Sequence, residues 1–162
     1  MPFLPTKEEM STLLAGSWRI RNFELTNDPN LTQQTTIVNR PCGRRPLGSL
    51  VLSRNPDYMC CMITSSEAAQ PISSPIYAFA PDAEVLRVAR PVLSCTGRYT
   101  LVKQENEGGW LMSTHVDVAV DPNWINTDQI QRVGLRKEGG KLIMKLLPIQ
   151  RIRLQVSPVE MS

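Results

Sequence analysis

Histidine is almost absent from this sequence, with one, His115, in 162 residues. Aromatic residues make up only 6% of the chain, and no apolar run approaches the roughly 20 residues of a membrane-spanning helix. The N-terminus lacks the basic segment and apolar run of a secretory signal peptide, which predicts a cytoplasmic protein without a membrane partner. The net charge is only +3, and the basic residues are scattered. Since nucleic-acid binding needs a clustered basic face, we expect no nucleic-acid partner.

The motifs of several enzyme classes are also missing. The sequence contains no GxSxG, no HExxH, no phosphate-binding P-loop and no dinucleotide fingerprint. Its four cysteines form no CxxC pair, and the adjacent Cys60 and Cys61 would point to opposite faces of a strand. We therefore expect reduced and partly buried thiols, no metal site and no cofactor.

Alternation of apolar and polar residues is what the sequence does have. Turn residues at 54–57, 107–109 and 138–140 predict hairpins between successive strands. Nine candidate strands favour an all-β barrel or sandwich, and we find no linker that would divide the single domain, 1–162. The strands are SWRIRNFEL, QTTIV, GSLVLS, YMCCMIT, GRYTLVK, GWLMSTHVDVAV, DQIQRVGLR, KLIMKLL and RIRLQV.

Two short helices are predicted beside the strands. Thr6 and Glu9 match a capping box, and apolar residues at helical spacing follow until Gly16. Asp82 is placed to cap a second helix over residues 83–90, inside a long connection between strands. Such a helix would cover the sheet or close one end of it.

Several of these segments together resemble a known family. A short helix before Gly16-Ser17-Trp18, with Arg151 and Arg153 in the last predicted strand, is similar to lipocalins, where an arginine covers a tryptophan at the barrel floor. The segments LLAGSWRIRNFEL, PCGRRPLGSLVLSRNPDYMCCMI, TGRYT and HVDVAVDPNWINTDQIQRVGLRKEGGKLIM resemble the small intracellular lipocalin-like domain family more closely, over roughly residues 10–155. The resemblance implies a single closed antiparallel barrel, of about eight to nine strands, around an internal cavity.

Polar residues on the predicted strands are the candidates for chemistry. We expect His115 or Glu24 to move a proton and Arg132 to hold a substrate oxygen. The sequence leaves open whether His115 is instead structural, because alternation alone does not show which strand face is inward. The residues predicted to contact substrate are Tyr99, Tyr58, Trp124, Asp117, Asn22 and Met112.

The leading functional hypothesis is a cofactor-free isomerase or cyclase that acts on a hydrophobic small molecule inside the barrel. The resemblance adds natural-product biosynthesis as the setting, because lipocalin-like barrels are used in this way there. Confinement and one general acid or base are sufficient for such a reaction without a metal or nucleotide. Two alternatives remain: a non-catalytic carrier of a hydrophobic metabolite, and an interaction domain with a filled barrel. A homodimer through side chains or a loop is also left open.

Overall fold

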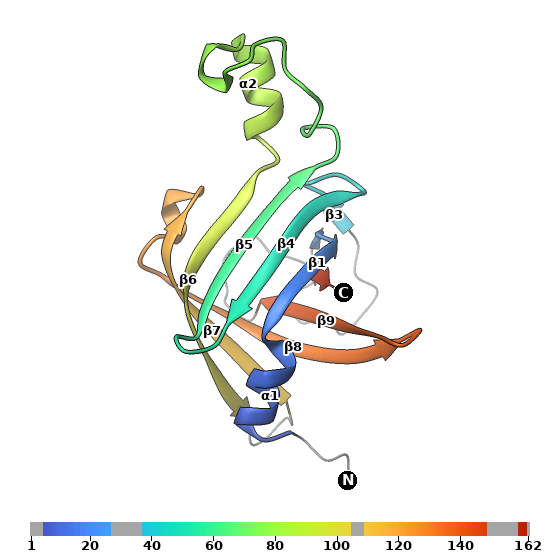
Figure 1. Ribbon diagram of the computed structural model, residues 1–162, viewed down its shortest axis with the longest axis vertical. Coiled ribbons are helices and arrows are strands. Elements are labelled where there is room, and N and C mark those ends of the chain that lie inside the picture. The colour runs from blue at the N-terminus through green and yellow to red at the C-terminus, as the bar shows by residue number, and fades with distance from the viewer. Residues whose placement is uncertain (1–4, 27–36, 105–108, 149–158, 162) are drawn as a thin grey trace.

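The protein is built on one curled antiparallel sheet (Figure 1). The computed structural model describes residues 5–26, 37–104, 109–148 and 159–161. Within these ranges seven longer strands pair in the order β1-β4-β5-β6-β7-β8-β9. They are β1 (Gly16–Asn22), β4 (Pro46–Ser53), β5 (Tyr58–Ser65), β6 (Leu93–Gln104), β7 (Gly109–Ala119), β8 (Asp128–Glu138) and β9 (Lys141–Pro148).

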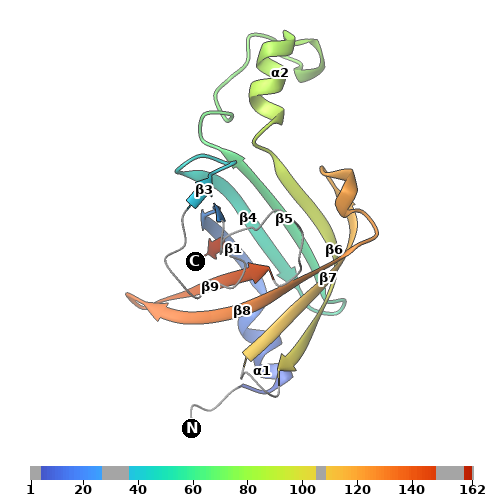
Figure 2. The same cartoon turned by 180° about the vertical axis from the view of Figure 1, so that it is seen from behind.

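Two short helices, two 3-10 turns and three short strands accompany this sheet in the described part of the chain. The helix α1 lies at one end and α2 stands beyond the opposite end, past the tips of β5 and β6, as both views show (Figures 1 and 2). None of the described helices has both the length and the apolar character needed to cross a membrane. The short elements are α1 (Lys7–Leu14), α2 (Asp82–Ala89), the 3-10 turns η1 (Tyr77–Phe79) and η2 (Pro122–Trp124), and the strands β2 (Leu25–Thr26), β3 (Ile37–Asn39) and β10 (Val159–Met161).

The seven longer strands form a half-barrel whose two ends, β1 and β9, are linked only through β10 in the described part of the chain. β10 is three residues long, and pairs with β1 through Ile20 and Asn22 and with β9 through Met144 to Leu146. The expected all-β antiparallel sheet is confirmed. The half-barrel does not confirm the expected closed barrel of eight to nine strands.

Three local expectations need correction or lie outside the described residues. Asp82 is the first residue of α2 and not its cap, because Pro81 occupies the N-cap position. β6 begins at Leu93, four residues before the predicted strand, because its pairing with β5 extends to Leu93 and its pairing with β7 continues across a bulge at Thr96 and Gly97. The predicted last strand, RIRLQV, and most of QTTIV fall outside the described residues.

Alternation along each strand separates the core from the solvent. On β1, Trp18 and Ile20 are buried, whereas Arg19 and Arg21 are exposed. The buried positions of the other long strands supply most of a single hydrophobic cluster on the concave side of the sheet. Burial of a leucine- or methionine-sized side chain stabilises the fold by about 1.5–3 kcal/mol, so this cluster stabilises the curled sheet.

The helix α1 packs on the core at one end of the sheet. Its predicted capping box is present: the Thr6 hydroxyl accepts from the Glu9 backbone N–H at 3.2 Å, and the Glu9 carboxylate accepts from the Thr6 backbone N–H at 2.7 Å. Met10 and Leu14 are buried, and the indole N–H of Trp18 donates to the Leu14 carbonyl at 2.8 Å. Trp18 is therefore fixed by α1, while Arg151 and Arg153, expected to cover it, lie outside the described residues.

Candidate functional site

The concave face of β7 is the part of the sheet most fully enclosed. Trp110, Met112, Thr114 and Val116 alternate along this strand, and each is at most 4% exposed. Met112, one of the predicted substrate-contacting residues, thus lies inside the fold, in the hydrophobic cluster. Alternation along the strand predicts one shared face for Met112, Thr114, Val116, Val118 and Val120; the first three are buried on it, whereas Val118 and Val120 are exposed.

Two polar atoms on this face lack a hydrogen-bond partner among the described residues. They are the indole Nε1 of Trp110 and the hydroxyl of Thr114. The side-chain oxygen of Gln104, at the end of β6 near the start of β7, is a third such atom. A buried polar group without a partner costs about 1–3 kcal/mol, so these atoms favour a polar group brought by a ligand. Trp110, Thr114 and Gln104 were not among the predicted site residues, although Trp110 and Thr114 share the alternation of Met112.

Tyr99 also lies inside, but its phenol is already engaged. Its side chain is 1% exposed, and its hydroxyl donates to the backbone carbonyl of Ser53 at 3.0 Å. Burial, reinforced by the negative charge of Asp57, raises the pKa of Tyr99. The phenol is therefore neutral near pH 7 and joins β6 to the end of β4.

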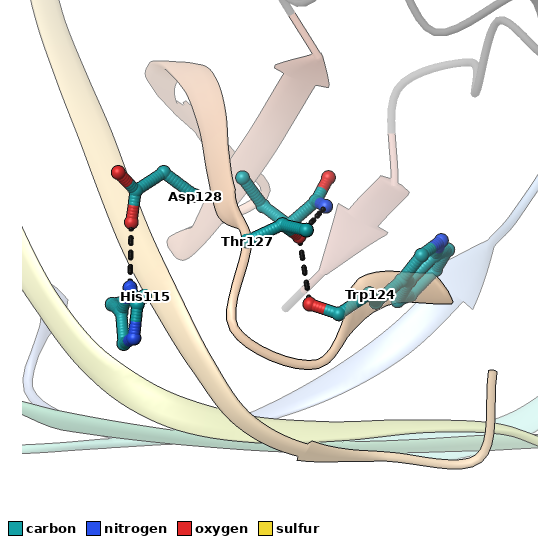
Figure 3. A network of polar contacts seen from close by, with 5 residues as sticks. His115, Trp124, Thr127 and Asp128 are labelled. Carbon is teal, nitrogen blue, oxygen red and sulfur yellow. Dashed lines mark hydrogen bonds and ion pairs between the residues drawn. The ribbon is translucent and has the colours of Figure 1, made fainter. Parts of the chain in front are cut away.

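His115 lies on the outer face of the same strand, where it pairs with Asp128 on β8 (Figure 3). Its Nδ1 is 2.9 Å from Oδ1 of Asp128, and the two side chains are 53% and 59% exposed. Asp117, one of the predicted substrate-contacting residues, is exposed on the same strand two residues further along. The partner of His115 is Asp128, because Asp128 stands directly opposite His115 in the β7–β8 register.

The turn between β7 and β8 is held by its own hydrogen bonds. The Thr127 hydroxyl donates to the carbonyl of Trp124 at 2.7 Å, and Gln129 donates to that hydroxyl at 3.0 Å (Figure 3). Trp124 itself is half-buried in η2, and the carboxylate of Asp121 caps this turn by accepting from the Asn123 backbone. These bonds hold Trp124 and the corner between β7 and β8 in place.

Arg132 does not come near His115, as the strand register shows. In the β7–β8 register Arg132 stands opposite Leu111, whereas His115 stands opposite Asp128. Four residues along a strand correspond to about 13 Å, which is too far for both side chains to hold one small group. Arg132 is also exposed, between the half-buried Gln131 and the buried Val133.

Glu24, the third predicted catalytic residue, forms a salt bridge just past the end of β1. Its Oε1 accepts from Nη2 of Arg40 at 2.8 Å and from Nε of Arg40 at 2.9 Å. The Glu24 side chain is only 15% exposed, and both of its bonds to Arg40 use the same carboxylate oxygen, Oε1. Asn22, predicted beside Glu24, is half-buried as the last residue of β1. Sequence reasoning did not find Arg40, which lies sixteen residues away from Glu24.

The predicted residues therefore do not form one cluster. Tyr99 and Met112 are inside; His115, Asp117 and Arg132 are on the outer surface. Asn22 is the last residue of β1, Glu24 lies just past it, and Trp124 lies at the β7–β8 corner. Tyr58 is half-buried on β5, and its hydroxyl donates to the Thr96 hydroxyl at 3.2 Å. Whether any of them binds or converts a substrate stays a prediction.

Cysteines face the same interior from β5 and β6. Cys61 and Cys95 stand directly opposite each other and pack against the core. Burial raises the pKa of Cys61 to about 12 and that of Cys95 to about 11. Such thiols are protonated at neutral pH and are poor nucleophiles and poor metal ligands. In the part of the chain that the structure describes, no three His, Cys, Asp or Glu side chains lie where they could jointly hold a metal ion.

Comparison with known proteins agrees with this architecture. The family model described as the lipocalin-like domain matches residues 15–157, a span that includes all seven longer strands. Searches among curated proteins and among solved structures found no match. The matched span and the curled antiparallel sheet establish that the chain belongs to the lipocalin-like domain family.

Proposed function

We propose that this protein binds a hydrophobic small molecule on the concave face of its sheet, with the molecule's polar group held by Trp110 and Thr114. Membership of the lipocalin-like domain family suggests a hydrophobic ligand. The observation that carries the proposal is the pair of buried, unpartnered polar atoms on one face of β7. An indole N–H and a hydroxyl suit a ligand with a carbonyl, ether or hydroxyl oxygen in an apolar skeleton.

Methionines on the same face supply the adaptability that ligand entry requires. Met112 on β7 and Met144 on β9 are both fully buried, and Met59 on β5 is nearly so. Unbranched thioether side chains change rotamer at low cost and pack against ligands of irregular shape. A ligand can therefore take up space on this face without moving the backbone of the strands.

The proposal includes two further expectations. The first is a complete barrel of eight to nine strands, supported by the pairing of β10 with both β1 and β9. The second is a cytoplasmic location, supported by four cysteines that are all free thiols.

A second candidate function is cofactor-free isomerisation or cyclisation of the same bound molecule, in secondary metabolism. The observation that favours it is Glu24, whose carboxylate is largely buried and keeps one oxygen, Oε2, outside its bonds to Arg40. A fixed carboxylate with an available oxygen can accept a proton from a substrate held beside it. His115 and Arg132 lie on the outer surface, so Glu24 is the predicted catalytic residue that we retain.

A binding experiment separates these functions. The purified full chain is incubated with a metabolite extract from its own source, and bound molecules are compared with a boiled control by chromatography and mass spectrometry. Thr114→Val, which removes the inward hydroxyl, is matched by Ser113→Ala, which removes the neighbouring outward one. We expect wild-type protein and Ser113→Ala to retain the same compound and Thr114→Val to retain less.

The chemistry of the recovered compound then decides between the candidates. A compound with unchanged mass and unchanged retention indicates a binding protein. A product of unchanged mass and shifted retention indicates isomerisation or cyclisation, and its loss in Glu24→Gln would assign the proton transfer. If no compound is enriched over the boiled control, both proposals are wrong.

A further inference from the structure

A second, chemically different hollow lies on the outer side of the sheet. A groove of about 1260 Å³ runs beside the exposed face of β1 and the start of β4. The segment that follows β5 also lines it, together with Arg87 of α2 and Lys141 at the start of β9. Figure 1 shows β1 and β4 side by side, with the segment after β5 leading away toward α2. The lining residues are Arg19, Ile20, Arg21, Arg45, Pro46, Leu47, Ser66, Glu67, Gln70, Pro71, Arg87 and Lys141.

The groove is strongly cationic, with five basic residues against the single acidic Glu67. Arg19 and Arg21 alternate with buried residues of β1 and so share its outer face, about 7 Å apart. Arg45 immediately precedes β4, the strand that pairs with β1. Within the described ranges, no ion pair neutralises Arg19, Arg21, Arg45 or Lys141. Four neighbouring positive charges repel one another, which an anionic ligand would relieve.

Arg87 has a different role in the groove, because it holds the segment after β5 in place. Its guanidinium donates to three backbone carbonyls, those of Glu67 at 2.9 Å and of Gln70 and Pro71 at 3.3 Å. A second pocket of about 490 Å³ shares Glu67 and Arg87 with the groove and adds Arg40 and Arg90 to its lining. Arg40 is already paired with Glu24, so its charge is largely balanced there.

The walls of the groove are not uniformly polar. Leu47 is 41% exposed although it belongs to a strand, and the exposed Pro71 lies in the same lining, whereas Ile20 and Pro46 are buried. An anion without an apolar part would leave this surface uncovered. The arrangement suits a molecule with an apolar chain and a compact, highly charged head.

We propose that the groove binds an amphiphilic small molecule with a phosphate or diphosphate head, held by Arg19, Arg21 and Arg45. A phosphate carries close to two negative charges at pH 7 and three acceptor oxygens, and guanidinium groups bond such oxygens in pairs. A carboxylate offers one charge and two oxygens to the same cations. This site lies on the other side of the sheet from Trp110 and Thr114, and the inference does not rest on the proposed function.

Calorimetric titration with octyl phosphate, below the concentration at which it forms micelles, tests the proposal. Octanoate has a similar chain with a single charge, and inorganic phosphate has the head alone. We expect octyl phosphate to bind at least about tenfold more tightly than either, and its affinity to fall as salt is raised. The double variant Arg19→Gln/Arg21→Gln should weaken binding by at least about tenfold.

Matched variants show whether the weaker binding of octyl phosphate results from the change in the groove. Arg98→Gln/Lys103→Gln removes two exposed charges from β6 and should keep the wild-type affinity within about twofold, as should Thr114→Val. Equal affinity for octyl phosphate and octanoate, or equal loss in both double variants, would overturn the proposal. Circular dichroism confirms that each variant is folded.

A vesicle assay tests whether the phosphate group belongs to a soluble small molecule or to a membrane lipid. Sedimentation is measured with vesicles of phosphatidylcholine that contain phosphatidic acid, and with vesicles of phosphatidylcholine alone. We expect the protein to bind octyl phosphate in solution without sedimenting with either vesicle. Sedimentation with the acidic vesicles, without binding of octyl phosphate, would assign the groove to a membrane surface and contradict a small-molecule site.

Discussion

His115 and Asp128 face each other across the β7–β8 hairpin, with Nδ1 of the imidazole 2.9 Å from Oδ1 of the carboxylate. Both side chains are more than half exposed on the outer surface. The single histidine of the chain is therefore separated by the sheet from the buried polar atoms of Trp110 and Thr114. The position of this pair indicates a role at the hairpin corner, away from the proposed ligand.

Replacement of His115 should accordingly have a small effect. Exposed ion pairs contribute about 0–1 kcal/mol, so we expect His115→Ala to lower the free energy of unfolding by no more than that. Urea denaturation of His115→Ala, Asp128→Ala and the double variant measures the change as a double-mutant cycle. Retention of the metabolite should be unchanged. Loss of ligand binding or turnover in a folded His115→Ala protein would restore His115 as a functional residue.

Thr114→Val should stabilise the ligand-free protein while weakening ligand binding. Valine has nearly the shape of threonine, and the substitution removes a buried hydroxyl that has no partner among the described residues. We expect the free energy of unfolding to rise by about 1 kcal/mol, part of the cost of an unpartnered polar group. Ser113→Ala, on the outer face of the same strand, is the control. A destabilised Thr114→Val protein would show that the hydroxyl has a partner in the free state.

Gly97 should tolerate no side chain, whereas Gly134 should accept one. A Cβ at Gly97 would overlap the carbonyl oxygen of His115, and it would lie 3.0 Å from the Cα of Val116. At Gly134 the nearest atoms are those of Lys145, at an ordinary 3.8 Å. We expect Gly97→Ala to destabilise the fold by more than about 3 kcal/mol or to prevent folding, and Gly134→Ala to change stability by less than about 1 kcal/mol. Similar melting temperatures for the two variants would contradict the close approach of β6 to β7.

The buried thiols make stability fall in alkaline solution. The pKa of Cys61 is raised to about 12 and that of Cys95 to about 11, from an ordinary value of 9.0. Between pH 9 and these values the unfolded state loses protons that the folded state keeps, so the free energy of unfolding falls as the pH rises. We expect Cys61→Ala to show a shallower decline than wild type over this window, with the exposed Cys60→Ala as the control. Parallel curves for wild type and Cys61→Ala would argue against burial of this thiol.

The same cysteines should differ in reactivity at neutral pH. Cys60 is exposed on β5, whereas Cys42 is fully buried and its thiol donates to the carbonyl of Pro91 at 3.2 Å. We expect iodoacetamide to label Cys60 first in the native protein and to reach the other three only on unfolding. Peptide mass spectrometry measures the order of labelling. Early modification of Cys42 or Cys61 would mean that the concave side opens to solvent.

Local patterns in the sequence predict the parts of this fold that depend on neighbouring residues. The capping box of Thr6 and Glu9 and the alternation of Met112, Thr114 and Val116 each involve residues a few positions apart, and both are observed. Pairings between distant residues are set by strand register and loop path, which alternation does not encode. This explains why the sequence did not identify Asp128 as the partner of His115, or Arg40 as the partner of Glu24.

The unpartnered atoms show a second limit of sequence reasoning. Trp110 and Thr114 look like ordinary core residues of a strand, because the sequence does not show whether their polar atoms find partners. The same holds for the groove beside β1, since Arg19, Arg21 and Arg45 are scattered along the chain and come together only when β1 pairs with β4. Both candidate sites thus depend on the arrangement of strands.

The most direct test of ligand binding on the concave face is the nuclear magnetic resonance signal of the Trp110 indole N–H. Trp18 and Trp124 provide internal references, because the Trp18 indole donates to the Leu14 carbonyl and Trp124 lies in η2 at the β7–β8 corner. When the retained metabolite is added to nitrogen-15-labelled protein, we expect the Trp110 signal to shift while the Trp18 and Trp124 signals stay in place. Binding of the metabolite with an unmoved Trp110 signal would contradict the proposed site.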